Sequence, residues 1–141
     1  MKLKYLLPAI MLGLLIFIFT ASKFATGENT LSLIQNSLGI DYNSAEVLNV
    51  IIRKSAHVLV FGTLSVFLYF LLKRRYFLSW ALATIYAISD EYHQSFVPGR
   101  TSTPYDVLLD SCAALVFIGM VRYIKTKETS KNRQNQEPPM H

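Results

Sequence analysis

Four apolar blocks fill most of this chain, and they restrict it to folds that place long helices in a membrane. The blocks run from about Tyr5 to Ala21, from Ala56 to Leu72, from Tyr76 to Ser89 and from Val107 to Tyr123. A helix that crosses a bilayer needs roughly 20 apolar residues. The third block is short, and it spans the membrane either by continuing from Asp90 to Tyr92 or by crossing a locally thinner bilayer. The sequence therefore predicts an all-α integral membrane bundle of four transmembrane helices.

Basic residues beside the blocks predict the orientation of the chain. The net charge is +5, with basic residues at the N-terminus, at 73–75 and from Arg122 onward. Short loops rich in Lys and Arg stay in the cytoplasm, and all three groups share that side only if the number of spans is even. We therefore expect a multi-pass cell-membrane protein with both termini cytoplasmic. Because these residues flank apolar blocks, membrane lipids are the expected partners and nucleic acid is not.

The chain is predicted to divide into three parts. Residues 1–22 form the first transmembrane helix, read as an uncleaved anchor; a cleaved signal peptide is the alternative, because Thr20-Ala21-Ser22 supplies small residues. Residues 23–124 hold an outer loop and three further transmembrane helices. Residues 125–141 are rich in Lys, Asn, Gln, Glu and Pro, which predicts a disordered cytoplasmic tail.

Two local patterns predict structure in and after the outer loop. Apolar residues at helical spacing between 31 and 38 predict a short helix on the membrane surface. Asn43 followed by Glu46 resembles a capping box, so the next helix is predicted to begin near Ser44. The single cysteine, Cys112, excludes an internal disulfide and is predicted to pack quietly among apolar residues.

Charged and polar residues collect at the predicted outer ends of three helices. The candidate ligand-binding residues are Arg53, Lys54, His57, Asp90, Glu91, Gln94, Arg100, Asp106 and Asp110. Residues three or four apart share one face of a helix, so each group points in one direction. Such side chains are costly beside hydrocarbon and turn toward one another. The pattern predicts an outward-facing polar pocket.

Three kinds of chemistry fit these residues. His57 with Asp90 or Glu91 could transfer protons, and these three are the catalytic candidates. The cationic members of the set could hold a phosphate or a carboxylate. Metal binding would need ligand spacings that the sequence lacks, so we expect neither a metal nor another cofactor.

Several of the same residues also fit structural roles. Thr103 and Pro104 are typical of a helix start, where the carboxylate of Asp106 would favour the helix dipole. Pro98-Gly99 is typical of a turn. His57 could be a hydrogen-bonded packing histidine.

The order of these motifs resembles the VanZ-like family of small multi-span bacterial membrane proteins. The resemblance covers about residues 50 to 120 and is carried by KSAH at 54–57, FG at 61–62, DEYHQSFVPGR at 90–100 and DVLLDS at 106–111. The family is named for a protein that accompanies glycopeptide resistance and raises tolerance to teicoplanin. The resemblance implies a cell-envelope protein without a settled substrate or reaction. Its implied site residues are Lys54, His57, Asp90, Glu91, Gln94, Arg100, Asp106 and Asp110.

Two positions depart from the family pattern. Position 110 is Asp where Asn is frequent, which adds a charge and weakens a proton-transfer role for that position. Ala113 stands where Gly is usual, which predicts slightly looser helix packing.

Three functions remain open from the sequence. The leading hypothesis is an envelope protein whose outward pocket binds an anionic or polar ligand, either a lipid headgroup or a lipid-linked cell-wall precursor, with a link to teicoplanin resistance. One alternative is a membrane-embedded acid/base enzyme that acts on a lipid-linked substrate. The other is a structural partner of another membrane protein, or an oligomer, in which the polar residues lock the helices together.

Overall fold

The structure is a computed structural model that describes residues 3–22, 26–100 and 102–134. This part of the chain forms five helices and no strand, which confirms the all-α prediction. The helices are α1 (Leu3–Ala21), α2 (Gly27–Leu38), α3 (Tyr42–Leu71), α4 (Tyr76–Gln94) and α5 (Pro104–Gln134).

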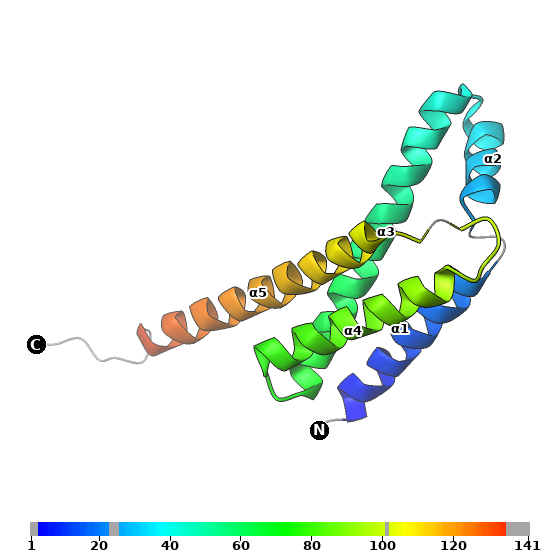
Figure 1. Ribbon diagram of the computed structural model, residues 1–141. Coiled ribbons are helices and arrows are strands. Elements are labelled where there is room, and N and C mark those ends of the chain that lie inside the picture. Colours follow the sequence, from blue (N-terminus) through cyan, green and yellow to red (C-terminus); the bar gives the residue numbers. More distant parts are fainter. Residues whose placement is uncertain (1–2, 23–25, 101, 135–141) are drawn as a thin grey trace, which may run out of the picture.

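Helices α1, α3, α4 and α5 form a bundle in which each packs against at least two of the others (Figure 1). Tyr5 at the start of α1 stacks on Phe70 at the end of α3, with ring centroids 5.2 Å apart. The guanidinium of Arg122 in α5 lies 5.9 Å from the ring of Tyr76 at the start of α4. The start of α1 and the part of α5 around Arg122 therefore lie at the same end of the bundle as the α3–α4 turn.

Helix α2 lies beyond the bundle, along the N-terminal half of α3 (Figure 1). Buried Asn49 of α3 joins the two helices, because its amide donates to the carbonyl of Gly27 at 2.9 Å and it accepts from Thr30 at 2.7 Å. The helix predicted between residues 31 and 38 is therefore present, and it is held against α3 by a buried polar contact.

Three helices are long and apolar enough to cross a membrane, namely α1, α3 and α5. Their large apolar side chains are mostly exposed, including Leu7, Met11 and Leu14 of α1. A surface of this kind suits contact with lipid. Helix α4 is not among these three helices, because its last turns carry Asp90, Glu91 and other polar residues.

Helix boundaries differ from the sequence prediction in two places. The N-cap of α3 is Asp41, and α3 starts at Tyr42, because the Asp41 carboxylate accepts the Ser44 N–H at 3.1 Å; the predicted capping box at Asn43 is wrong. The hydrogen bonds with Ser44 lower the pKa of the Asp41 carboxyl. Helix α5 continues to Gln134, whereas disorder was predicted from Lys125. Strong helix formers and a Lys125–Glu128 pair at 2.9 Å extend it.

Two further predictions concern Cys112 and the C-terminal tail. The cysteine at position 112 is exposed on α5, so the structure does not support the packing role predicted for it in this apolar stretch. Residues 135–141 of the predicted disordered tail lie outside the described residues.

Close contact between α3 and α5 depends on Gly62. A Cβ placed on Gly62 would lie 2.6 Å from the Phe117 ring, too near for real atoms. Gly62→Ala is therefore expected to destabilise the purified protein by about 1–3 kcal/mol, because overpacking forces helices apart. Thermal unfolding in detergent measures the loss.

Gly119→Ala is the matched control. Beyond the adjoining residues and its own helix backbone, no described atom lies within 4 Å of a Cβ at Gly119. Alanine also favours the helix by up to about 1 kcal/mol. Equal stability of the two variants would contradict the packing role of Gly62.

Candidate ligand-binding site

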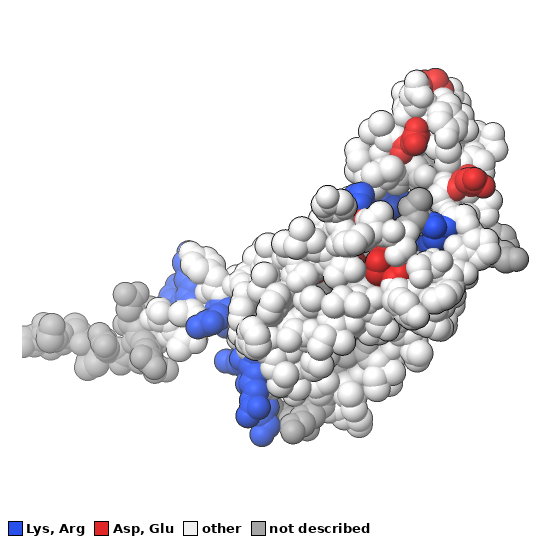
Figure 2. Space-filling view, viewed as in Figure 1, with Lys and Arg blue, Asp and Glu red and all other residues white. Residues whose placement is uncertain are grey.

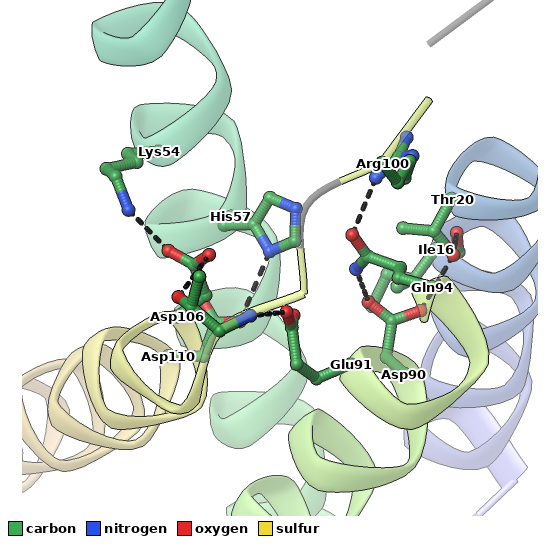
Figure 3. Close-up of polar contacts among 11 residues, drawn as sticks. Ile16, Thr20, Lys54, His57, Asp90, Glu91, Gln94, Arg100, Asp106 and Asp110 are labelled. Carbon is green, nitrogen blue, oxygen red and sulfur yellow. Dashed lines mark hydrogen bonds and ion pairs between the residues drawn. The ribbon is translucent and has the colours of Figure 1, made fainter. Parts of the chain in front are cut away.

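Acidic and basic side chains occur together only at one end of the face shown in Figure 2, where α2 joins the bundle. At the other end of that face only Lys and Arg are in view, and the Glu128 that pairs with Lys125 on α5 is not seen. Residues of α1, α3, α4, α5 and the α4–α5 loop meet at the mixed end through hydrogen bonds and ion pairs, which fall into two networks (Figure 3).

The first network is centred on Asp90 of α4. Its Oδ1 accepts from the Thr20 hydroxyl of α1 at 2.7 Å, and its Oδ2 accepts from Gln94 Nε2 at 2.7 Å. Gln94 Oε1 in turn accepts from Arg100 Nη1 at 2.8 Å. The cation of Arg100 is thus connected to the Asp90 carboxylate through one glutamine. Asp90 and Gln94 are only 4% and 2% exposed.

A tight turn places Arg100 over this network. The Arg100 N–H donates to the Val97 carbonyl at 3.2 Å, and Gly99 has φ 81°. Proline followed by a glycine with positive φ is the pattern of a type II turn, so the predicted turn at Pro98-Gly99 is confirmed. Burial and nearby Arg53 lower the pKa of the Arg100 guanidinium from its ordinary value, although Asp90 and Glu91 oppose that shift.

The second network joins α3 to the start of α5. Lys54 Nζ donates to Asp106 Oδ1, and the Thr103 hydroxyl donates to Asp106 Oδ2 at 3.0 Å. One turn deeper, His57 Nδ1 lies 3.2 Å from Asp110 Oδ2. Helix α5 begins at Pro104, as predicted, so Asp106 serves both the helix start and an ion pair with α3.

Glu91 fixes the α4–α5 loop to α4. Its Oε1 accepts the backbone N–H of Thr103 at 2.6 Å, and its carbonyl accepts the Ser102 hydroxyl at 3.0 Å. This side chain is only 7% exposed. The contact holds the N-terminus of α5 beside α4 and so positions Asp106 and Asp110.

A small polar pocket of about 100 Å³ lies among these helices. It is lined by Val50, Arg53, Lys54, His57, Glu91, Gln94, Asp106 and Leu109. Arg53 is half-buried here, and no acceptor among the described residues pairs with its guanidinium. Asp110 Oδ1 is buried beneath and likewise has no partner in the described part of the chain.

The structure brings all nine sequence-predicted residues to this end of the bundle, but it pairs some of them differently from the expectation. His57 bonds to Asp110, and no hydrogen bond among the described residues joins it to Asp90 or Glu91. Asp90 instead belongs to the Gln94 network, and Glu91 holds the loop backbone.

Three supporting residues were missed by sequence reasoning. Thr20 bonds Asp90, Thr103 bonds both Glu91 and Asp106, and Asn49 joins α2 to α3. A polar residue inside an apolar helix, such as Asn49, was the available signal, because such a residue needs a partner. No signal in the sequence identified the partner.

The side chains at this end are of the kinds that can bind an anion or transfer a proton. Among the residues that can be placed, no cluster of three His, Cys, Asp or Glu side chains is arranged to hold a metal ion. Cations from α3 and the loop instead face carboxylates from α4 and α5. The fold and site together define a small helical membrane protein with a buried polar cluster at one end of its bundle.

A family model described as VanZ/LLP1 matches residues 5–125, so this chain belongs to the VanZ-like family. The match includes α1 and α2 as well as the motif-bearing helices. No curated protein and no solved structure matches the chain.

Proposed function

We propose that the chain crosses the cell membrane four times, with both termini in the cytoplasm and the polar cluster outside. Lys54 of α3 pairs with Asp106 at the start of α5, so the chain must return to the same end of the bundle through α4. Helix α4 has 19 residues and is about 29 Å long, close to the roughly 30 Å of a hydrocarbon core. The basic residues 73–75 then lie on the cytoplasmic side.

The first helix is proposed to be a retained anchor and not a cleaved signal. It carries buried Ala9 and Ile16, and the Gly13 carbonyl accepts the Tyr86 hydroxyl at 2.6 Å. Thr20 also completes the Asp90 network. Removal of α1 would expose these contacts to lipid, where unsatisfied polar groups are costly.

The proposed activity is binding of an anionic or polar envelope ligand, either a lipid headgroup or a lipid-linked cell-wall precursor. The observation that carries it is Arg53, a half-buried cation without a partner among the described residues, in a pocket that also contains Lys54 and His57. A buried cation is stabilised by an anion that bonds to it. Binding outside the membrane also suits a role in tolerance to teicoplanin, a drug that acts there.

Lys54→Gln tests this proposal. The Lys54 side chain is half-exposed and Asp106 keeps its bond to Thr103, so the fold should survive. Wild-type protein purified in mild detergent is expected to carry an anionic species in native mass spectra. The variant should retain about a tenth as much, since a charge-assisted hydrogen bond is lost.

Arg75→Gln is the matched control, because Arg75 is exposed at the opposite end of the bundle. It should retain the wild-type amount of the anionic species. Equal retention by Lys54→Gln and wild type would overturn the binding proposal. Loss of protein abundance alone would instead favour a structural role beside another membrane protein.

The His57–Asp110 pair favours a second candidate function, proton transfer to a lipid-linked substrate. With Nδ1 facing Asp110, Nε2 of His57 remains for a substrate. The same lipid extracts distinguish the two functions. A chemically altered species that appears with wild type and disappears with His57→Gln would support catalysis, whereas an unaltered bound species supports binding.

A further inference from the structure

A second and larger cavity lies beside the polar pocket. It is a groove of about 620 Å³ between α1 and α3, and residues of α2 form its third wall. Its walls are almost entirely apolar and include Leu15, Ile16, Ile34, Ile52, Ala56 and Val60. This volume falls in the range of roughly 300–1,000 Å³ that is usual for small-molecule sites.

The groove is open to the surface beside the apolar part of α1. Its rim residues Leu15, Phe19 and Leu33 are 58%, 59% and 62% exposed. Because α1 is apolar enough to cross a membrane, the part of the opening beside α1 would face hydrocarbon in a bilayer. An occupant would therefore enter from the bilayer.

Three basic side chains contribute to the lining of the groove. They are Arg53, Arg100 and His57, although nearly all of the exposed wall is apolar. The Arg53 guanidinium lies against the first residue of α2, 3.1 Å from where a Cβ on Gly27 would stand. Two neighbouring arginines repel each other, and an anion between them would relieve that repulsion.

The groove and the polar pocket share two of their lining residues, Arg53 and His57. These residues separate an apolar space from a polar one. A molecule with a hydrocarbon part and a polar part could occupy both cavities, with its charged junction at Arg53.

We propose that the groove holds a hydrocarbon chain of a membrane lipid whose phosphate contacts Arg53 and Arg100 and whose headgroup enters the polar pocket. This inference rests on the proposed function and names the class of its ligand. Charge complementarity with two arginines selects a lipid of net negative charge over a zwitterionic or uncharged lipid, and the apolar walls select a lipid over a soluble phosphate.

The test uses full-length protein in detergent and native mass spectrometry with three probes of known structure. Phosphatidylglycerol should bind at least about tenfold more tightly than phosphatidylcholine of equal chain length. Glycerol phosphate, which has the anionic group without chains, should not displace it. Arg53→Gln should remove most of the preference, and Arg53→Lys should keep part of it because the charge remains.

A groove-filling variant tests the hydrocarbon part separately. Ala56→Trp places a large side chain in the groove and should lower phosphatidylglycerol binding about tenfold. Val116→Trp, at an exposed position of α5 outside the groove, is the control and should bind like wild type. A lipid with a photoreactive chain should label groove residues such as Ile34 and Ile52 in wild type, and less so in Ala56→Trp.

The outcomes separate this inference from the proposal on which it rests. If glycerol phosphate competes as well as the lipid, and Ala56→Trp binds like wild type, the groove is not a chain site although anion binding stands. If neither lipid nor glycerol phosphate binds in a way that depends on Arg53 or Lys54, both proposals fail.

Discussion

Gln94→Leu is expected to destabilise the protein by about 2–3 kcal/mol while leaving the shape of α4 unchanged. Leucine has nearly the same size and favours the helix, but it can neither donate to Asp90 nor accept from Arg100. The Asp90 carboxylate is almost fully buried and would keep only the Thr20 hydroxyl as a partner. Leaving a buried charged group short of a partner costs more than the lost bond is worth. Unfolding of the purified protein in detergent measures the change.

A second substitution sharpens this prediction. Adding Asp90→Leu to Gln94→Leu removes the stranded carboxylate, and the Thr20 hydroxyl can then donate to the Ile16 carbonyl, 2.8 Å away. The double variant should therefore recover at least about 1 kcal/mol relative to Gln94→Leu alone. Gln35→Leu on α2, outside the network, should change stability by less than about 0.5 kcal/mol. Additive losses in the double variant would show that Asp90 and Gln94 do not act as one unit.

Cysteine labelling of intact cells is expected to give an all-or-none pattern that follows the proposed topology. In a Cys112→Ser background, cysteines at Ser37 and Tyr105 should react with a membrane-impermeant maleimide. Cysteines at Arg75 and Lys127 should react only after permeabilisation. All four positions are exposed in the structure, so differences in labelling report the side of the membrane and not burial.

The pair Tyr105 and Lys127 decides whether α4 crosses the membrane. If α4 did not cross, α5 would run in the opposite direction, and Lys127 would be labelled from outside while Tyr105 was protected. That result would refute the four-span proposal and move the polar cluster away from the outer face. Cys112 must be replaced first, because its thiol is exposed on α5.

The position of the polar cluster matters for both proposals because it determines which molecules can reach it. In the proposed topology the cluster lies at the outer membrane rim, where it would meet lipid headgroups and cell-wall precursors on one side and hydrocarbon on the other. Arg53 and His57 stand at that boundary between the two cavities. A ligand with an anionic group and a hydrocarbon chain would fit the polar pocket and the apolar groove at the same time.

Much of this molecule was determined by the sequence itself. Long apolar blocks can satisfy their backbone in lipid only as helices, so the helical fold and the helical course of residues 56–71, 76–89 and 107–123 followed directly. The turn at Pro98-Gly99 and the helix start at Pro104 also followed, because proline and glycine restrict the backbone locally. The sequence likewise indicated which polar residues would meet, since none is stable facing lipid alone.

The pairing of those residues was decided only by tertiary structure. Several carboxylates and cations stood within reach of one another, and spacing along one helix cannot show which residue of the next helix lies opposite. The close approach of α3 and α5 at Gly62 set that register and brought Asp110 to His57. The apolar groove could not be predicted from the sequence for the same reason. Its walls come from three helices, and a space between helices leaves no pattern in the sequence of any one helix.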